Sequence, residues 1–148
     1  MSICGAVLWL ANVTRPELAY AASQLARFVS NPGEAHYAAA KRVLHYLDTT
    51  SGRTLVFQLP AVAAEREFKI YVDSDWSATL SVSGAYLFFM GCPVAWFSKV
   101  QKSVTLSSAE SEYFGATLAA KEGLWLRDLL TDLDRRGPHG TDYDVSRQ

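Results

Sequence analysis

Two carboxylates end an apolar stretch that has the alternation of a β-strand. Asp73 and Asp75 close this stretch, which begins at Phe68. Because strand side chains alternate between faces, positions i and i+2 point the same way. Crowding two carboxylates costs free energy unless a cation offsets their charge, so the pair is a candidate metal site. The alternative is that one of them, Asp75 more readily than Asp73, caps a turn.

A second acidic pair begins a helical pattern. Ser107-Ser108-Ala109-Glu110 has the spacing of a capping box, in which Glu110 reaches back to the N-cap amide. Glu112 has no such role, and at about 100° per residue it projects from a different side of the helix. It could face the strand end that carries Asp73, and carboxylate oxygens suit Mg²⁺. Asp73 and Glu112 are therefore the candidate metal ligands.

The segments around these carboxylates predict a small α/β unit. β-formers and apolar residues favour strands at 68–73, 85–90 and 93–98, with Gly91-Cys92-Pro93 as the turn between the last two. The capping box predicts a long amphipathic helix that runs to about Leu130. Three strands followed by a helix suggest an α/β fold whose sheet begins as an antiparallel meander.

The N-terminal part has helical periodicity. Thr14-Arg15-Pro16-Glu17 predicts the start of a helix over 15–29, and Asn31-Pro32-Gly33-Glu34 predicts the start of a second. The two helices would form a hairpin. The apolar stripe of the second helix is expected at Tyr37, Ala40, Leu44 and Leu47.

A change of pattern separates the two parts. Residues 54–58 have the alternation of a strand, and residues 59–67 are expected to be a linker. This boundary gives a helical segment over 1–58 and an α/β domain over 66–148. Hydrophobic residues make up 49% of the chain, which is enough for a real core.

Charge and cysteine usage narrow the function classes. The 14 basic and 15 acidic residues give a net charge of -1, which excludes a strongly cationic, autonomous nucleic-acid binder. Nucleic-acid contact must be local, for example at Lys41 and Arg42, whose alternative role is a solvated helix face. Cys4 and Cys92 lack metal-ligand spacing, and the sequence has no signal peptide or apolar run of about 18 residues. We expect an intracellular chain without a membrane span.

Five motifs follow one another from the first strand to the end of the long helix. They are Tyr71-Val72-Asp73-Ser74-Asp75-Trp76, the stretch Ser81 to Gly91, Ala95-Trp96-Phe97-Ser98-Lys99, the stretch Leu106 to Tyr113, and the stretch Lys121 to Arg127. In this order they resemble the ribonuclease H region of copia-type LTR retrotransposon Pol polyproteins. The helical hairpin is similar to the segment that connects the reverse transcriptase to that region. Together the resemblance covers most of residues 4 to 132.

The resemblance implies a ribonuclease-H-like mixed sheet and hydrolysis of the RNA strand of an RNA/DNA hybrid. Asp73 and Glu112 stand where the family has its first two metal-binding carboxylates, and Asp144 is the candidate third. Two Mg²⁺ ions about 4 Å apart, with Mn²⁺ as a substitute, would activate a water and stabilise the leaving oxygen.

The implied partners are nucleic acid and the remainder of the polyprotein, including reverse transcriptase and integrase. Lys99 and Lys102, with Lys41 and Arg42, are candidate phosphate contacts, or else ordinary surface cations. The expected location is cytoplasmic, in virus-like particles, or nuclear.

The chain departs from the family pattern in two places. The loop between Trp76 and Ser83 is shorter, and the family's fourth catalytic aspartate has no counterpart before Gln148. We therefore expect a C-terminally truncated domain whose catalysis is weak or absent in isolation. The competing hypothesis is an inactive fragment, either a nucleic-acid-binding remnant or a relic.

Overall fold

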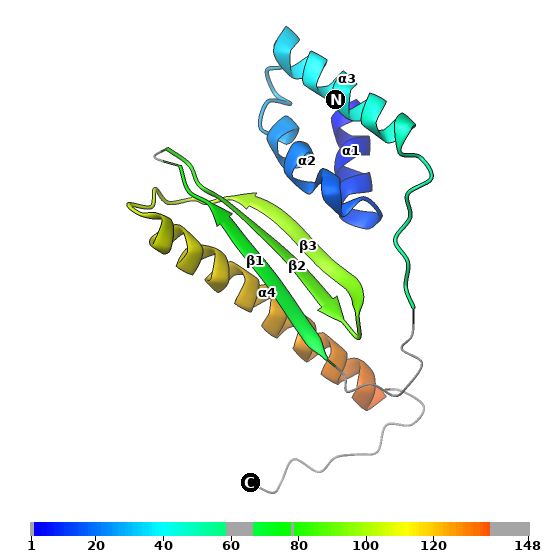
Figure 1. Ribbon diagram of the computed structural model, residues 1–148, viewed down its shortest axis with the longest axis vertical. Coiled ribbons are helices and arrows are strands. Elements are labelled where there is room, and N and C mark those ends of the chain that lie inside the picture. The colour runs from blue at the N-terminus through cyan, green and yellow to red at the C-terminus, as the bar shows by residue number, and fades with distance from the viewer. Residues whose placement is uncertain (1, 59–66, 78, 137–148) are drawn as a thin grey trace, which may run out of the picture.

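The computed structural model describes residues 2–58, 67–77 and 79–136, which form a helical unit and a sheet unit (Figure 1). The helical unit comprises α1 (Ser2–Val13), the 3₁₀ helix η1 (Pro16–Leu18), α2 (Ala19–Ala26) and α3 (Glu34–Thr49). The sheet unit comprises β1 (Phe68–Asp75), β2 (Val82–Phe89), β3 (Cys92–Val100) and α4 (Ser108–Arg136). The predicted site residue Asp144 lies outside the described residues. None of the described helices is long and apolar enough to cross a membrane.

The sheet is antiparallel and has the order β1-β2-β3, as the sequence predicts for its first three strands. Its register pairs Tyr71 with Tyr86, and Tyr86 with Trp96. The parallel strand that a mixed sheet requires is not among the described strands. Within the described residues, β1 pairs on one side only, so its outer edge is open.

A two-residue turn joins β2 to β3. Met90 and Gly91 both have positive φ, 52° and 78°, as a type I′ hairpin requires. The predicted turn at Gly91-Cys92-Pro93 lies too far along the chain, because Cys92 already pairs with Phe89.

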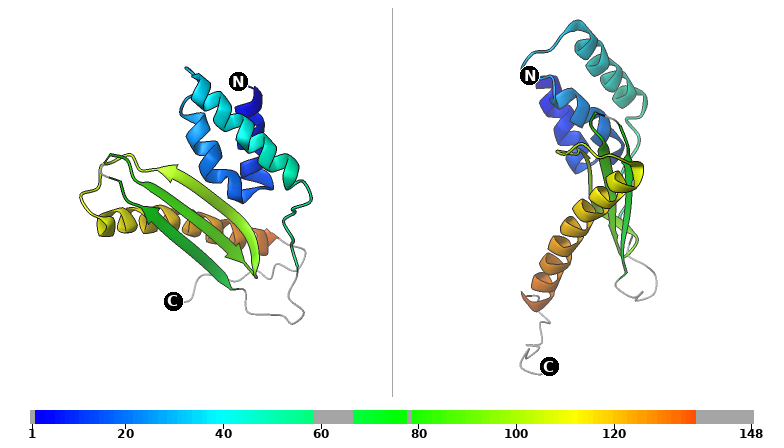
Figure 2. Two further views of the ribbon diagram at one scale, coloured as in Figure 1. Left: turned by 45° about the horizontal axis from the view of Figure 1, so that its top comes forward. Right: turned by 90° about the vertical axis from the view of Figure 1, so that its left-hand side faces the viewer.

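α4 packs along one face of the sheet (Figure 2). Two glycines on its inner side let it approach β1 closely: an added Cβ at Gly115 would lie 2.2 Å from Ser74 Oγ, and one at Gly123 would lie 2.5 Å from Ile70 Cδ1. The core beneath the helix is built on four buried side chains, Ala85, Leu87, Ala119 and Leu126.

The helical unit has its own core and contains a helix that the sequence did not predict. Its buried side chains are Val7, Ala11, Leu18 and Ala22. The expected hairpin is therefore a three-helix unit, because α1 packs against α2 and also contacts α3. α1 is apolar on nearly all sides and has no acidic residue in its first turn, so it lacks both an amphipathic period and a start signal.

The predicted helix over 15–29 is shorter and begins differently. Glu17 does not cap it, because its carboxylate binds Arg15 Nε at 2.6 Å. The chain instead forms η1 and then α2, which ends at Ala26.

α3 has the predicted position but packs through a different stripe. Val43, Tyr46 and Leu47 contact the core, whereas Tyr37 and Leu44 are exposed. The two stripes overlap and have the same helical spacing, so the pattern alone does not distinguish them.

The expected strand at 54–58 is wrong. These residues have no regular secondary structure, and Val56 and Phe57 are 65% and 63% exposed. Alternation favours a strand only where a partner strand satisfies the backbone, and here none of the described strands pairs with this segment.

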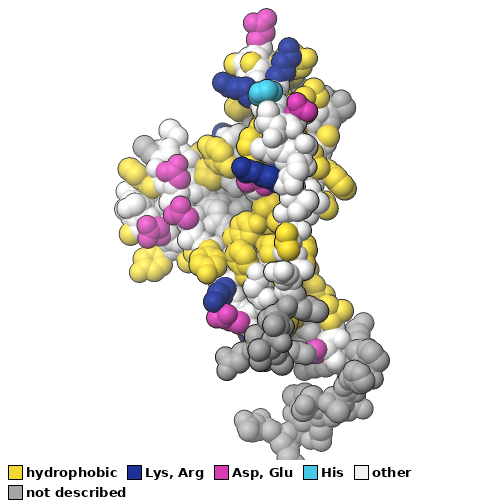
Figure 3. Space-filling model, turned by 45° about the vertical axis from the view of Figure 1, so that its right-hand side comes forward, with side chains coloured by type: hydrophobic (Ala, Val, Ile, Leu, Met, Phe, Trp, Pro, Cys, Tyr) yellow, Lys and Arg dark blue, Asp and Glu magenta, His cyan; other side chains and the backbone are white. Residues whose placement is uncertain are grey.

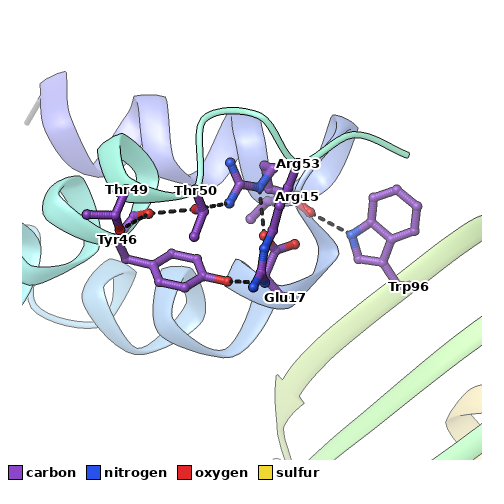
Figure 4. Close-up of polar contacts among 8 residues, drawn as sticks. Arg15, Glu17, Tyr46, Thr49, Thr50, Arg53 and Trp96 are labelled. Atoms are coloured by element: carbon purple, nitrogen blue, oxygen red, sulfur yellow. Dashed lines mark hydrogen bonds and ion pairs between the residues drawn. The ribbon is translucent and has the colours of Figure 1, made fainter. Parts of the chain in front are cut away.

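Arg15 connects the start of η1 to the end of α3 (Figure 4). It is 7% exposed, and besides Glu17 it binds Thr50 Oγ1 at 2.6 Å. The hydrogen bond to Glu17 raises the pKa of Arg15, and attraction to that carboxylate acts in the same direction against the opposing effect of burial. The guanidinium also lies over the Tyr46 ring.

Candidate functional site at the end of β1

The two predicted metal ligands line one open groove between the outer edge of β1 and the first turns of α4. The groove has a volume of about 600 Å³. Its lining residues are Val72, Asp73, Ser74, Ala109, Glu112, Tyr113 and Ala116. Asp73 lies two residues before the end of β1, and Glu112 lies in the second turn of α4. Residues 39 positions apart in the sequence thus meet at one surface.

The start of α4 assigns different roles to its two glutamates. Glu110 donates its backbone N–H to Ser107 Oγ at 3.1 Å, and its carboxylate accepts the N–H of Leu106 at 2.7 Å. Glu110 is therefore a capping residue, as its spacing predicts, although it caps Leu106 and not the N-cap amide itself. Glu112 has no part in the cap and faces the groove.

Asp73 and Glu112 are both exposed, and neither has a basic partner in the part of the chain that the structure describes. Asp73 Oδ1 accepts the N–H of Ser74 at 2.9 Å. Within the described residues, neither carboxylate forms a salt bridge. Asp75 is exposed as well, but it is not part of the groove lining. Figure 3 shows acidic side chains gathered over this end of the sheet unit.

The donor set that the described residues provide is a pair of carboxylates. No group of three or more His, Cys, Asp or Glu side chains capable of holding a metal occurs in the described part of the chain. The candidate third ligand, Asp144, lies outside it. Two hard oxygen donors can hold Mg²⁺, which keeps several waters and binds substrate phosphate as well.

The four predicted phosphate contacts are spread over the molecule and do not line the groove. Lys99 on β3 binds Glu122 Oε1 at 2.8 Å and lies over the Phe97 ring. Lys102 is exposed between β3 and α4. On α3, Arg42 is exposed and Lys41 lies over the ring of Tyr37. The Lys and Arg side chains of the helical unit are interspersed with acidic ones and lie apart from the acidic end of the sheet (Figure 3).

A buried polar cluster that the sequence patterns did not predict lies directly behind the groove. Its members are Ser74, Ser83, Gln101 and Ser111. A signal existed: Ser74 and Ser83 occupy strand positions that are more buried than their neighbours on either side, where an apolar side chain is the norm.

Comparison with known proteins identifies homologues of the chain. It is 37% identical over 148 residues to the retrovirus-related Pol polyprotein from transposon TNT 1-94 of Nicotiana tabacum, a match that covers 97% of this chain. It is 33% identical over 138 residues to the Pol polyprotein from transposon RE1 of Arabidopsis thaliana, covering 90% of this chain. The chain is homologous to a fragment of copia-type retrotransposon Pol polyproteins. It corresponds to a short segment, since it spans 11% and 9% of these two polyproteins.

The Pol segment also resembles a protein of nearly its own length. The chain is 42% identical over 132 residues to the secreted RxLR effector protein 161 of Plasmopara viticola, and the match covers 85% of this chain and 89% of that protein. No family model matches the chain, and no solved structure is significantly similar to it.

Proposed function

We propose that this Pol segment is a ribonuclease H that hydrolyses the RNA strand of RNA/DNA hybrids, preceded by the segment that links it to reverse transcriptase. The observation that carries the proposal is the meeting of Asp73 and Glu112 in one open groove. The resemblance of the surrounding motifs to the ribonuclease H region supports it. Reverse transcriptase and integrase would be its neighbours in the polyprotein, in virus-like particles or the nucleus.

The groove suits a magnesium-dependent reaction. Asp73 and Glu112 offer carboxylate oxygens without a competing cation from the described residues, and the N–H of Ser74 orients one oxygen of Asp73. Bound Mg²⁺, or Mn²⁺ in its place, would activate a water and neutralise charge on the scissile phosphate. Asp144 is the proposed third ligand. Without such a cation, the acidic end of the sheet would repel a phosphate backbone.

Substrate binding would depend on shape and charge. A hybrid has A-like geometry, and its 2′-hydroxyl groups distinguish the RNA strand in a shallow minor groove. The groove is open and accepts a strand lying across it. Lys102 is the nearest candidate phosphate contact in sequence to α4, whereas Lys99 is already paired with Glu122.

Cleavage of a labelled hybrid in Mg²⁺ by the full chain tests the proposal. Asp73→Asn and Glu112→Gln each retain side-chain volume and should abolish cleavage. Asp75→Asn and Glu110→Gln are the matched controls, since neither residue lines the groove. Asp75→Asn should cleave normally, and Glu110→Gln should cleave but unfold more easily, because the cap is weakened. Cleavage that is equal in the native chain and in Asp73→Asn would overturn the proposal. The absence of any cleavage would favour the competing hypothesis of an inactive fragment.

A second candidate function is nucleic-acid binding without cleavage. The observation that favours it is the exposed pair Lys41 and Arg42, which lies on α3 and outside the groove. This function predicts hybrid affinity that persists in Asp73→Asn and falls with salt. Because each phosphate contact contributes about -0.9 to the slope of log K against log salt, Lys41→Gln with Arg42→Gln should flatten that slope by about two units. Salt-independent binding, or an unchanged slope, contradicts it.

A further inference from the structure

A buried hydrogen-bonded relay joins the end of β1 to the start of α4. Ser83, Gln101 and Ser111 are at most 1% exposed, and Ser74 is partly buried above them. The side chains come from β1, β2, the residue after β3, and α4. The relay therefore spans the whole sheet at the end that carries the groove.

Gln101 is the centre of this relay. Its Nε2 donates to Ser83 Oγ at 2.8 Å, to Ser111 Oγ at 2.9 Å and to the carbonyl oxygen of Ser111 at 3.0 Å. Ser83 Oγ in turn shares a hydrogen bond of 2.9 Å with Ser74 Oγ. A single amide group thus holds a β1 side chain and an α4 backbone carbonyl in one network.

The hydrogen bonds of Gln101 determine the orientation of its amide, and this orientation leaves a buried oxygen unpaired among the described residues. Rotating the amide by 180° would place Oε1 against the Ser111 carbonyl, so that two acceptors would face each other. In the observed orientation Oε1 is buried and has no partner among the described residues. A buried unpaired acceptor costs free energy that an apolar side chain of the same size would avoid. An apolar side chain would in turn leave Ser83 and Ser111 without their donor, so the reason for a polar side chain lies in the groups that Nε2 holds.

The two ends of the relay identify that reason. Ser74 is the residue after Asp73, and its N–H binds the Asp73 carboxylate. Ser111 is the residue before Glu112. Gly115 keeps the approach open, because a Cβ there would collide with Ser74 Oγ.

We propose that Gln101 is a positioning residue that fixes the separation of Asp73 and Glu112, and so sets the affinity of their groove for a divalent cation. The inference rests on the proposed function where it is tested by hybrid cleavage. The test by hydrogen exchange does not depend on that function. Gln101 is buried behind the groove and touches neither substrate nor cation.

The test variant is Gln101→Met, which retains length and volume but removes the amide. Gln58→Met makes the same change at an exposed position and is the control. Partners that fix metal ligands in place affect metal affinity by about 10–100-fold. Gln101→Met should therefore need at least about tenfold more Mg²⁺ for half-maximal hybrid cleavage. Its kcat at saturating Mg²⁺ should fall much less. Its unfolding midpoint should fall modestly, because Ser83 and Ser111 lose a buried donor while the loss of the unpaired Oε1 offsets part of that cost.

Backbone amide hydrogen exchange, without metal or substrate, provides the geometric readout. In Gln101→Met, exchange should accelerate at residues 73–75 and 108–112, together with the paired residues 82–84, and remain unchanged in the rest of β2 and in the helical unit. Ser111→Ala removes the α4 end of the relay and should accelerate exchange in the same two segments. This variant allows the role of the relay to be tested even if Gln101→Met folds poorly.

The outcomes separate this inference from the proposed function. Unchanged exchange in both variants overturns the relay, whether or not the chain cleaves. Faster exchange over the entire sheet unit also overturns it, because Gln101 would then be a general core residue. Local exchange changes in a chain that never cleaves hybrid support the relay and reject the ribonuclease. An unaltered Mg²⁺ requirement in a chain that does cleave rejects the role in metal affinity.

Discussion

Trp96 of β3 donates its indole N–H to the carbonyl oxygen of Ala11 in α1 at 2.6 Å, which connects residues 85 positions apart. Ala11 lies in the last turn of α1, where helix carbonyls have no intrahelical partner. By strand alternation Trp96 points to the sheet face opposite that covered by α4, and α2 contacts β3 as well (Figure 4). The helical unit and the sheet therefore share an interface.

We predict that Trp96→Phe weakens this interface. The change keeps an aromatic ring beside Tyr86 and removes the N–H, which leaves the Ala11 carbonyl without its donor. The free energy of unfolding should fall by about 1 kcal/mol, as urea denaturation measures. Trp125→Phe, at a position 60% exposed, is the control and should change it little. Equal effects in both variants would show that the hydrogen bond does not stabilise the interface.

We predict that Arg15→Lys destabilises the helical unit although it keeps the charge. Arg15 binds Glu17 through Nε and Thr50 through Nη2, each at 2.6 Å, and an ammonium group cannot span both. The expected loss is about 1–3 kcal/mol in the free energy of unfolding. Arg27→Lys is the control, because Arg27 is exposed and its hydrogen bond to Gln24 is longer, 3.2 Å. A loss no larger in Arg15→Lys than in this control contradicts the prediction.

The sequence predicted the elements whose signals are local. The strands of the antiparallel meander and the start of α4 follow from alternation and from the Ser107–Glu110 cap. α1 was missed because a helix that is apolar on most sides has no period to detect. The segment 54–58 was assigned wrongly because alternation does not show whether a partner strand is present.

The candidate site was predictable in part, because two of its residues belong to elements that have local sequence signals. Asp73 and Glu112 stand at the ends of recognisable elements, so topology alone brings them to one edge of the sheet. Gln101 was not recognised, because its role depends on which side of the sheet α4 covers and how closely it approaches. That distance is set by Gly115, whose significance is visible only beside Ser74.

We predict that Gly115→Ala destabilises the sheet unit, although alanine has a higher helix propensity than glycine. Alanine in a helix interior is normally favoured over glycine by about 1 kcal/mol. Here the new Cβ would lie 2.2 Å from Ser74 Oγ, so either Ser74 must leave its rotamer and its hydrogen bond to Ser83 or α4 must move away from β1. The expected net loss is about 1–3 kcal/mol in the free energy of unfolding.

Gly5→Ala is a control that should change the free energy of unfolding in the opposite direction. Gly5 lies within α1, and an added Cβ there meets nothing within 4 Å. This variant should gain about 0.5–1 kcal/mol, measured by the same denaturation. If both variants shifted stability in the same direction, close packing of α4 would not be the cause.

Tyr86 gives the chain a predicted alkaline transition. It stacks between Phe88 and Trp96, with ring centroids 4.9 Å and 5.8 Å away. Burial raises the pKa of Tyr86 above its ordinary value of 10.0, and the negative charge of Glu17 adds to the effect. Because the folded state binds this proton more tightly, the stabilisation is fully present below pH 10 and is lost as the pH rises through the folded-state pKa.

Ultraviolet titration of phenolate formation checks this directly. Phenolate formation in the native chain should include a late step above the ordinary range, and Tyr86→Phe should remove that step. Tyr20→Phe, at a position 58% exposed, is the matched control for the spectroscopic change. The free energy of unfolding should also fall less steeply above pH 10 in Tyr86→Phe than in the native chain. A late titration step that survives in Tyr86→Phe would assign it to another tyrosine and contradict the burial of Tyr86 at this interface.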